Sequence, residues 1–328
     1  MLVSGPNGAG KTNLLEALHL GTQGFSPRTR SDAQMVRFGA ESARVELKGK
    51  NDGASFESAV ALGLREARRA RLNGAWLKSA DQLRSELRTL VFTPDRLAVV
   101  KGSPAVRRAY LDRSVGRLFP ARASVPVEYA AAVGQRNAAL RRIAAGTSSR
   151  EALAPWTEAV ASLGGTLVES RRETIALLAP AFGSVAGSLG LFAATLSYGG
   201  EAPTIEEHDE RLARDLERGV TGIGPHLHEI ELEAGGRELR SFGSQGEQRL
   251  AVLSLVLAEA EVLTTRSGGS PLVLLDDVLS ELDEERRLAL ATLVAARGQT
   301  VVTTTAASAL PAEPAQSLVV SSGTVRQG

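Results

Sequence analysis

The feature that most constrains this chain is a glycine-rich segment, residues 5–12, which fits the pattern G-x-x-x-x-G-K-[ST]. In such a loop the backbone N–H groups turn inward around phosphate oxygens, and the following helix directs its positive end at them. Lys11 is expected to reach the terminal phosphates of a nucleoside triphosphate, and the Thr12 hydroxyl to ligate Mg²⁺. An apolar strand end at residues 2–3 and an apolar helical stripe from residue 13 to 18 flank the loop. The residues expected to contact the nucleotide are Gly5, Pro6, Asn7, Gly8, Ala9, Gly10, Lys11, Thr12 and Asn13.

A second motif lies far downstream, where an apolar run, residues 271–275, ends in Asp276 and Asp277. A continuous apolar run of this length predicts a strand buried on both faces. Open α/β sheets bind ligands at the carboxyl ends of such strands, so we expect Asp276 to hold the Mg²⁺ ion with Thr12. Asp277 would then face the attacking water, although a helix-cap role is open for it as well. Since both motifs must meet around one Mg²⁺, a large insert is predicted to interrupt the nucleotide fold.

Composition limits the class of protein. The hydrophobic share of 43% and the charged share of 23% are typical of globular domains in water. The absence of cysteine excludes disulfides and cysteine-based zinc sites. No signal-peptide pattern is present, so we expect a cytoplasmic protein. The four histidines lack the spacing of a metal site, which leaves Mg²⁺ as the only metal expected.

One uncharged stretch, residues 174–200, is long enough for a membrane span. It contains Pro180 together with Gly183, Gly187 and Gly190, which disrupt a continuous apolar helix. The segment is therefore predicted to be a helix end, a loop and then a strand near residues 191–198, and no membrane partner is expected.

Positive charge is concentrated in residues 63–150, which hold 18 Lys and Arg residues against 6 Asp and Glu residues. Such a region suits a polyphosphate partner such as DNA, although solvated helix faces would give the same composition. Arg107 and Arg108 diverge by about 100° on a helix, so one is expected to contact DNA while the other pairs with an acid such as Asp112. Salt bridges within the lobe remain the alternative for both. The DNA-binding candidates are Arg65, Arg68, Arg107 and Arg108.

Between the two nucleotide motifs the pattern is mainly helical. Apolar residues keep helical spacing over residues 125–143 and 153–167, and no heptad pattern persists long enough for a long coiled coil. A capping box at Thr204 predicts a helix that stops at Gly219. Residues 229–239 alternate as a hairpin around two glycines.

The last part of the chain returns to strands. Residues 300–305 are predicted to form a buried strand, and residues 317–326 a final hairpin. We therefore expect an ATPase lobe formed by residues 1–110 and 201–328 and a mainly helical lobe formed by residues 111–200.

Further motifs resemble those of ABC-type ATPases. Residues 244–249, S-Q-G-E-Q-R, open a predicted helix just before the Asp-Asp strand and resemble the ABC signature. Residues 280–283, S-E-L-D, follow that strand and resemble a D-loop. The segments at 94–112, 135–137, 224–226 and 274–287 closely resemble the RecF family, and the similarity covers nearly the whole chain.

The resemblance implies an α/β fold, an ABC-type P-loop ATPase head with a helical second lobe and no long coiled coil. In such heads two ATP molecules are held between two copies of the chain, and the signature of one copy faces the phosphate loop of the other. Carried over to this sequence, Ser244 and Gly246 contact the γ-phosphate held by the partner copy, and Asp283 packs across the interface. Lys11, Asp277 and Ser244 form the implied catalytic set, in which Asp277 orients or deprotonates the attacking water.

RecF-like proteins bind double-stranded DNA at gaps or junctions in an ATP-dependent way, act with RecO and RecR, and help to load RecA. The resemblance therefore implies a role in DNA replication, recombinational repair and the SOS response, with ATP and Mg²⁺ as cofactors and a weak, DNA-dependent ATPase activity. Because shared ATP brings two basic surfaces together, the nucleotide state can control DNA affinity. Two other classes remain open: the nucleotide-binding subunit of an ABC transporter, and a truncated scaffold that binds nucleotide without hydrolysing it.

The sequence departs from the family pattern at three places. Only residues 1–4 precede the phosphate loop, where the family has further strands, so a late start or a truncated form is expected. After Gly-Pro-His the family usually reads Arg-Asp-Asp, and this chain reads Leu227-His228-Glu229. ABC transporters place a switch histidine after the late strand, whereas residues 301–305 read V-V-T-T-T. Thr304 is a weak substitute for that histidine, so slow hydrolysis is predicted.

Overall fold

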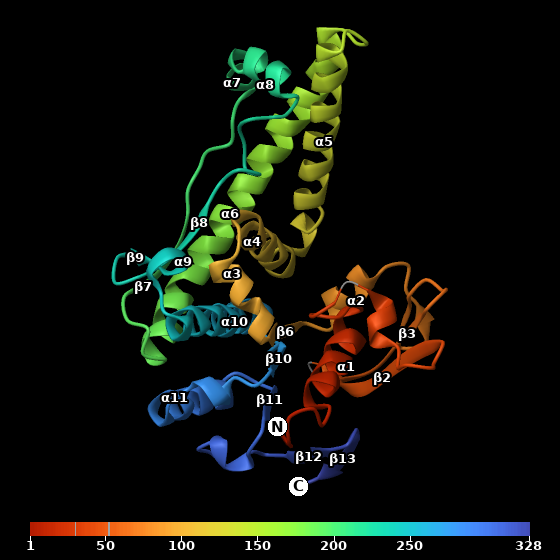
Figure 1. The fold of residues 1–328 in the computed structure, drawn as a ribbon, viewed down its shortest axis with the longest axis vertical. Helices are drawn as coiled ribbons and strands as arrows, with labels where there is room; N and C mark the ends of the chain where they lie inside the picture. The colour runs from red at the N-terminus through yellow and green to blue at the C-terminus, as the bar shows by residue number, and fades with distance from the viewer. Residues whose placement is uncertain (30, 52) are drawn as a thin grey trace. The chain divides into compact units, whose positions relative to one another are not determined.

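The computed structural model describes residues 1–29, 31–51 and 53–328 (Figure 1). The chain divides into two compact units. Unit 1 consists of Met1–Leu97, Ser184–Phe192 and Ser244–Gly328, and unit 2 of Ala98–Gly183 and Ala193–Gly243. From the sequence we expected the boundaries between the two lobes to fall after residues 110 and 200. The two units of the structure have different boundaries.

Unit 1 is built on a six-stranded sheet with the order β13-β12-β1-β11-β10-β6. Neighbouring strands are parallel except β12 and β13, which form an antiparallel hairpin. The strand before the loop, the Asp-Asp strand, the late strand and the final hairpin are thus confirmed. The bounds are β1 (Leu2–Ser4), β6 (Thr89–Phe92), β10 (Leu272–Leu275), β11 (Thr300–Thr304), β12 (Ser317–Ser321) and β13 (Thr324–Gln327).

Helices pack against this sheet, and their apolar residues form one hydrophobic core with those of the strands. Val3, Leu274 and Val301 of the sheet share a buried cluster with Leu15 of the first helix. The helices of unit 1 are α1 (Lys11–Gln23), α2 (Ala80–Glu86), α10 (Gln245–Ser267) and α11 (Glu284–Ala295). Short 3₁₀ helices lie at Asp32–Met35, Pro94–Leu97, Leu279–Glu281 and Ala307–Ala309.

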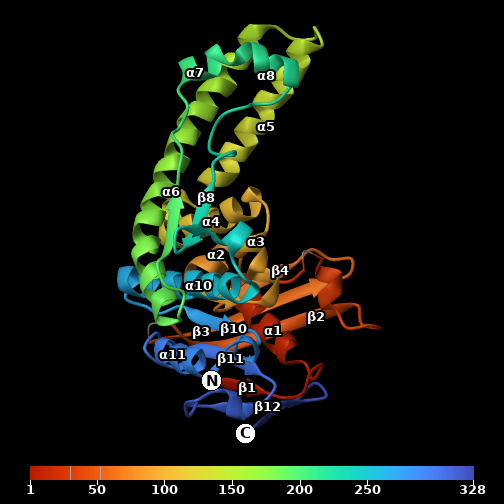
Figure 2. The ribbon, with the colours of Figure 1, turned by 60° about the vertical axis from the view of Figure 1, so that its left-hand side comes forward.

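Unit 1 also contains an antiparallel sheet that was not identified from the sequence. Its strands, in spatial order, are β2 (Ser42–Asn51), β3 (Ala54–Gly63), β4 (Arg69–Leu72) and β5 (Ala75–Trp76). Asn73 and Gly74 join the last two strands with φ values of 49° and 84°, as a two-residue hairpin turn requires. Helix α1 lies against β2 and β3 (Figure 2). This approach needs a glycine, because a Cβ at Gly21 would lie 2.4 Å from the Cδ1 atom of Leu47.

Unit 2 is mainly helical, with a three-stranded antiparallel sheet, β7-β8-β9. Its helices are α3 (Ala98–Lys101), α4 (Pro104–Leu118), α5 (Val125–Ala144), α6 (Ala154–Ser188, whose last turn belongs to unit 1), α7 (Ile205–Glu210), α8 (Leu212–Arg218) and α9 (Leu239–Phe242). The strands are β7 (Ala194–Tyr198), β8 (Ile230–Ala234) and β9 (Arg237–Glu238). Short 3₁₀ helices lie at Pro120–Arg122 and Arg150–Leu153.

Several expectations for unit 2 are confirmed. Helices α5 and α6 occupy the two segments with helical spacing and run alongside each other, sharing the buried residues Tyr129 and Val160 (Figures 1 and 2). The Thr204 capping box opens α7 and a helix ends at Gly219, but the single helix predicted between them is divided at Arg211 into α7 and α8. The hairpin β8–β9 turns at its two glycines.

The expected loop and strand follow α6, but the prediction that Pro180, Gly183 and Gly187 disrupt the helix was wrong, since α6 continues through all three to Ser188. No helix within the described residues combines the length and the apolar character that crossing a membrane requires.

The core of unit 2 contains a buried cation. Arg136 on α5 is 0% exposed, and its Nη1 atom donates to Asp215 Oδ2 at 2.8 Å and to Thr221 Oγ1 at 2.9 Å. Its Nε atom donates to Thr157 Oγ1 at 3.2 Å. The attraction within a buried ion pair must offset the loss of hydration of both charges. Removing one partner therefore leaves the other charge buried and unpaired, which destabilises the fold. This cluster therefore ties α5 to α6, α8 and the following loop.

We expect Asp215→Ala to lower the free energy of unfolding by about 3–5 kcal/mol, since it leaves the Arg136 guanidinium buried and unpaired. Urea denaturation followed by circular dichroism measures this change. A matched control is Glu173→Ala, which removes the partner of Arg122 in a pair with 32% and 39% exposed side chains. The control is expected to cost less than about 1 kcal/mol. Equal losses for both variants would contradict the role of the buried pair.

Candidate nucleotide-binding site

The phosphate loop connects β1 to α1, and its backbone requires glycine at several positions. A Cβ at Gly5 would lie 2.2 Å from the carbonyl oxygen of Val320, so no side chain fits there. Gly8 and Gly10 adopt φ values of 78° and 107°, in the left-handed region that favours glycine. Gly10 is also the N-cap of α1, whose first turn carries no acidic side chain. The positive end of the helix is therefore open to an anion.

Lys11 bends back over the loop that contains it. Its side chain is 8% exposed, and its Nζ atom donates to the carbonyl oxygens of Gly5 at 2.7 Å and Pro6 at 3.0 Å. An ammonium group held by neutral carbonyls can exchange them for phosphate oxygens, which form stronger, charge-assisted hydrogen bonds. The Lys11 ammonium group therefore lies next to the loop carbonyls, in a position from which it can contact a bound phosphate.

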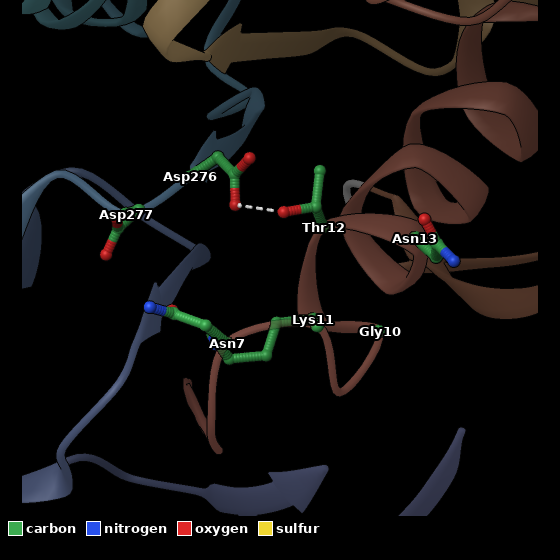
Figure 3. Close-up of a pocket in the computed structure, with 8 residues that line it drawn as sticks. Asn7, Gly10, Lys11, Thr12, Asn13, Asp276 and Asp277 are labelled. Carbon is green, nitrogen blue, oxygen red and sulfur yellow. Dashed lines mark hydrogen bonds between the residues drawn. The ribbon is translucent and has the colours of Figure 1, made fainter. Parts of the chain in front are cut away.

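The two motifs predicted to meet do so. The Thr12 hydroxyl donates to Asp276 Oδ1 at 3.1 Å across 264 positions of sequence (Figure 3). The pocket around this contact is lined by Asn7, Gly8, Gly10, Lys11, Thr12, Asn13, Asp276 and Asp277. Asn13 points away from the contact in Figure 3. Gly5, Pro6 and Ala9 shape the loop but do not line the pocket.

A residue not singled out from the sequence, Thr303 on β11, contacts the Asp276 carboxylate and the Asp277 backbone. Its hydroxyl donates to Asp276 Oδ1 at 2.8 Å and accepts the backbone N–H of Asp277 at 2.9 Å, and the residue is 0% exposed. Thr304, the substitute expected for a switch histidine, instead donates to the carbonyl of Ala306 at 3.1 Å. Adjacent residues of a strand face opposite sides, so the position of β11 in the sheet decides which threonine meets the aspartates.

Asp277 adopts an uncommon backbone conformation, with φ at 48°. Few residues other than glycine occupy this region, and such strain costs about 1–3 kcal/mol. Its Oδ1 atom is buried and has no hydrogen-bond partner among the described residues. Asp277 is therefore not satisfied as a helix cap, and its carboxylate is available to a group entering the pocket.

The signature segment begins a helix, as expected from the sequence. Ser244 is the N-cap of α10, and its hydroxyl accepts the N–H of Glu247 at 3.2 Å while the Glu247 carboxylate accepts the N–H of Ser244 at 2.8 Å. The Ser244 hydroxyl also donates to Glu247 Oε2 at 2.8 Å, and the hydrogen bonds that the carboxylate accepts from the Ser244 backbone and side chain lower the pKa of Glu247. Ser244 and Gly246 are exposed and lie outside the pocket of their own phosphate loop.

The D-loop segment is tied to the signature helix. Arg249 on α10 forms an ion pair with Glu281, with 2.6 Å between Nη1 and Oε1. Asp283 is exposed and caps α11 by accepting the N–H of Arg286 at 2.9 Å. Like Ser244 and Gly246, Asp283 is absent from the lining of the pocket. The ion pair therefore joins the signature helix to the D-loop segment within unit 1.

The four arginines considered for DNA binding have different environments. In unit 1, Arg65 is exposed, and Arg68 pairs with Asp32. In unit 2, Arg107 is 4% exposed and donates to Glu229 Oε2 at 2.9 Å, so the salt bridge within the lobe is correct for it and a DNA contact is not supported. Arg108 is half-buried and donates to the carbonyl of His228 at 2.9 Å.

The divergent tripeptide 227–229 has a structural role in unit 2. Glu229 is the partner of Arg107, and His228 holds Arg108 by its carbonyl while its Nδ1 atom lies 2.9 Å from the Tyr198 hydroxyl. Burial, followed by the charge of Arg171, lowers the pKa of His228. Asp112 pairs with Arg171 rather than with Arg107 or Arg108, through contacts of 2.8 and 3.0 Å.

Comparison with known proteins places these features in a family. The family described as RecF/RecN/SMC N-terminal domain matches residues 1–322. The DNA replication and repair protein RecF of Heliobacterium modesticaldum is 35% identical over 315 residues, which cover 92% of this chain and 85% of that protein.

Solved structures agree with the sequence relatives. A structure of the recombination mediator protein RecF with ATPrS, in the RecFOR pathway, superposes with a TM-score of 0.85 at 26% identity and covers 99% of this chain and 91% of that chain. An Smc head bound to the C-winged helix domain of ScpA has the same fold, with a TM-score of 0.60 at 17% identity over 100% of this chain and 88% of that chain. The chain belongs to the RecF/RecN/SMC N-terminal domain family and, within it, to the RecF proteins.

Proposed function

We propose that this chain is an ATP-binding protein of DNA replication and recombinational repair, whose ATP state controls self-association and DNA binding. The observation that carries the proposal is the contact between Thr12 and Asp276, which joins the two nucleotide motifs in one pocket. The names of the relatives supply the biological setting, since the similar proteins are RecF proteins and one is described with an ATP analogue.

The residues of the pocket fit ATP and Mg²⁺. A threonine hydroxyl and a carboxylate are hard oxygen ligands of the kind that Mg²⁺ prefers, and Thr12 and Asp276 supply both. When bound, Mg²⁺ neutralises negative charge on the terminal phosphates. Lys11 would contact the same phosphates, and the N–H groups of the glycine loop would hold them in place. Asp277 would accept a hydrogen bond from the attacking water through its unpartnered Oδ1 atom.

ATP would also join two copies of the chain. Ser244, Gly246 and Asp283 are exposed and lie outside the pocket of their own chain. In the proposed homodimer, Ser244 and Gly246 contact the γ-phosphate held by the second copy, and Asp283 packs across the interface. Hydrolysis is slow and resets the dimer, because β11 carries no histidine to act on the γ-phosphate.

DNA binding would follow the same cycle. Closing two copies doubles the basic surface presented to a phosphate backbone, so ATP raises the affinity for duplex DNA at gaps or junctions. Arg65 and Arg108 remain candidates for this contact, and Arg68 keeps a partly exposed guanidinium beside Asp32. We place the protein in the cytoplasm, with mediators of the RecO and RecR type as partners that help to load recombinase.

We expect Lys11→Met to weaken ATP binding by about 10- to 100-fold, since charge-assisted hydrogen bonds to phosphate are lost. Analytical ultracentrifugation with a labelled gapped duplex, with and without ATP and Mg²⁺, measures the consequence. Wild-type protein dimerises and sediments with the DNA only with ATP, and Lys11→Met does neither. Lys101→Met, which changes an exposed lysine of unit 2, is the matched control and behaves as wild type. A wild-type protein that stays monomeric and ignores DNA would overturn the proposal.

Asp277→Asn separates ATP binding from hydrolysis. Asparagine also tolerates the left-handed backbone at this position, so the fold is retained. We expect ATP turnover to fall by about 10²- to 10⁴-fold, as for loss of a general base, while the ATP-bound dimer persists longer. Phosphate release and dimer lifetime are measured on the same samples. Unchanged turnover would remove Asp277 from the catalytic set, and a wild type without turnover would identify a binding scaffold.

Ser244→Asp tests the contact between two copies. Aspartate is as good an N-cap as serine, so α10 stays intact, but its charge repels the γ-phosphate of the other copy. We expect ATP-dependent dimerisation to be lost, while ATP binding to the monomer and the melting temperature change little. Thr204→Asp alters the other capping box of this chain and is the control that keeps dimerisation. A Ser244→Asp protein that dimerises normally would place the interface elsewhere.

A further inference from the structure

One face of the antiparallel sheet of unit 1 packs against helix α1, and most side chains of the opposite face are exposed among the residues that the structure describes. Val60, Leu62 and Ala70 point to the inner face and share a buried cluster with Leu20 of α1. Residues alternate between the faces of a strand, and directly paired residues share a face. The opposite side, here called the outer face, therefore consists of Arg44, Glu46, Lys48 and Lys50 of β2, Ser55, Glu57, Ala59 and Ala61 of β3, Arg69 and Arg71 of β4, and Trp76 of β5.

The outer face has an excess of positive charge. Its two acids are already engaged, because Glu46 pairs with Arg44, and Glu57 pairs with Lys48 at 2.9 Å between Oε1 and Nζ. Lys50, Arg69 and Arg71 form no ion pair with any acid in the part of the chain that the structure describes. Three uncompensated cations on one flat surface attract a polyanion. They are the residues of this face that a phosphate backbone would contact.

An aromatic ring lies among these cations. Trp76 on the edge strand β5 pairs directly with Arg71 across the sheet, and its side chain is 67% exposed. Its indole is therefore accessible to a ligand, and a large ring that combines an apolar body with an N–H donor suits an interface. On the far side of β4, the positions of β3 that pair with Arg71 and Arg69 are Ala59 and Ala61, which carry small side chains.

We propose that the outer face binds single-stranded DNA, with Trp76 stacked on a base and Lys50, Arg69 and Arg71 against the phosphates. Four-stranded sheets with exposed aromatic and basic side chains bind unpaired strands in this way, because each base offers a π-face to the ring. A duplex keeps its bases stacked inside, where an indole cannot reach them. The inference rests on the proposed function and deepens it: the face would bind the unpaired strand of a gapped duplex.

The sequence allows a direct test, because it holds two tryptophans, Trp76 and Trp156. Trp156 lies on α6 of unit 2 and is 37% exposed, which makes it a matched reporter that is not a residue of the outer face. Oligothymidine is titrated into Trp156→Phe, which reports on Trp76 alone, and into Trp76→Phe, which reports on Trp156 alone. We expect quenching of Trp76 emission and none of Trp156. Equal quenching of both, or quenching of Trp76 by a duplex but not by oligothymidine, would overturn the proposal.

Affinity measurements complete the test, using fluorescence anisotropy of labelled oligothymidine. Trp76→Ala is expected to weaken binding by about 5- to 100-fold, the usual effect of losing one base–aromatic stack. Arg71→Ala is expected to lower the slope of log affinity against log salt by about 0.7, the value for one phosphate of a single strand. Arg142→Ala, an exposed arginine on α5, is the charge control and leaves both quantities unchanged. Wild-type affinity and slope in Trp76→Ala and Arg71→Ala would remove the outer face from DNA binding.

Two outcomes separate this inference from the proposed function. A protein that dimerises with ATP and binds duplex, but shows no Trp76 quenching by oligothymidine, contradicts the outer face and leaves the ATP-controlled function intact. Quenching of Trp76 in a protein that ignores ATP supports the outer face and contradicts the proposed ATP control.

Discussion

The site depends on the order of three parallel strands. β11 lies between β1, which leads into the phosphate loop, and β10, which ends at the two aspartates. Parallel strands end at the same edge of a sheet, so the loop, the aspartates and Thr303 converge there. Thr12 and Thr303 both donate a hydrogen bond to the Oδ1 atom of Asp276, which fixes the position of that carboxylate. If other strands lay between β1 and β10, the phosphate loop and the aspartates would still end at the same edge but would be too far apart to share one pocket.

Unit 2 is organised by buried charge rather than by apolar packing alone. Arg136 with Asp215, and Arg171 with Asp112, join segments that are 79 and 59 positions apart. Each arginine makes several directional hydrogen bonds. Because their geometry is specific, these bonds restrict the positions of the helices within unit 2 more tightly than apolar contacts do. The family-like segments around residues 94–112, 135–137 and 224–226 supply many of these groups. In this structure these groups make structural contacts that join the segments of unit 2.

Local signals in the sequence predicted the elements that carry chemistry. The glycine loop, the apolar run before Asp276 and the capping box at Thr204 each specify their own geometry over a few residues, and each was found as expected. The antiparallel sheet β2–β5 was missed although Asn73-Gly74 is a strong hairpin signal. Thr303 was missed and Thr304 chosen instead, because strand periodicity does not tell which face meets Asp276. Arg107 was similarly ambiguous, since burial of a cation depends on partners far away in sequence.

By itself, the amino-acid sequence determined the class of fold, the phosphate loop with its lysine and threonine, the paired aspartates and the family. These depend on short-range patterns, since glycine conformations, apolar runs and helix caps act over a few neighbouring residues. Only the tertiary structure decided that Thr303 contacts both aspartates, that Arg107 is buried against Glu229, and that Trp76 stands beside Arg71 on a basic face. Strand order, register and burial arise from contacts between distant segments, and no local pattern encodes which partner each side chain meets.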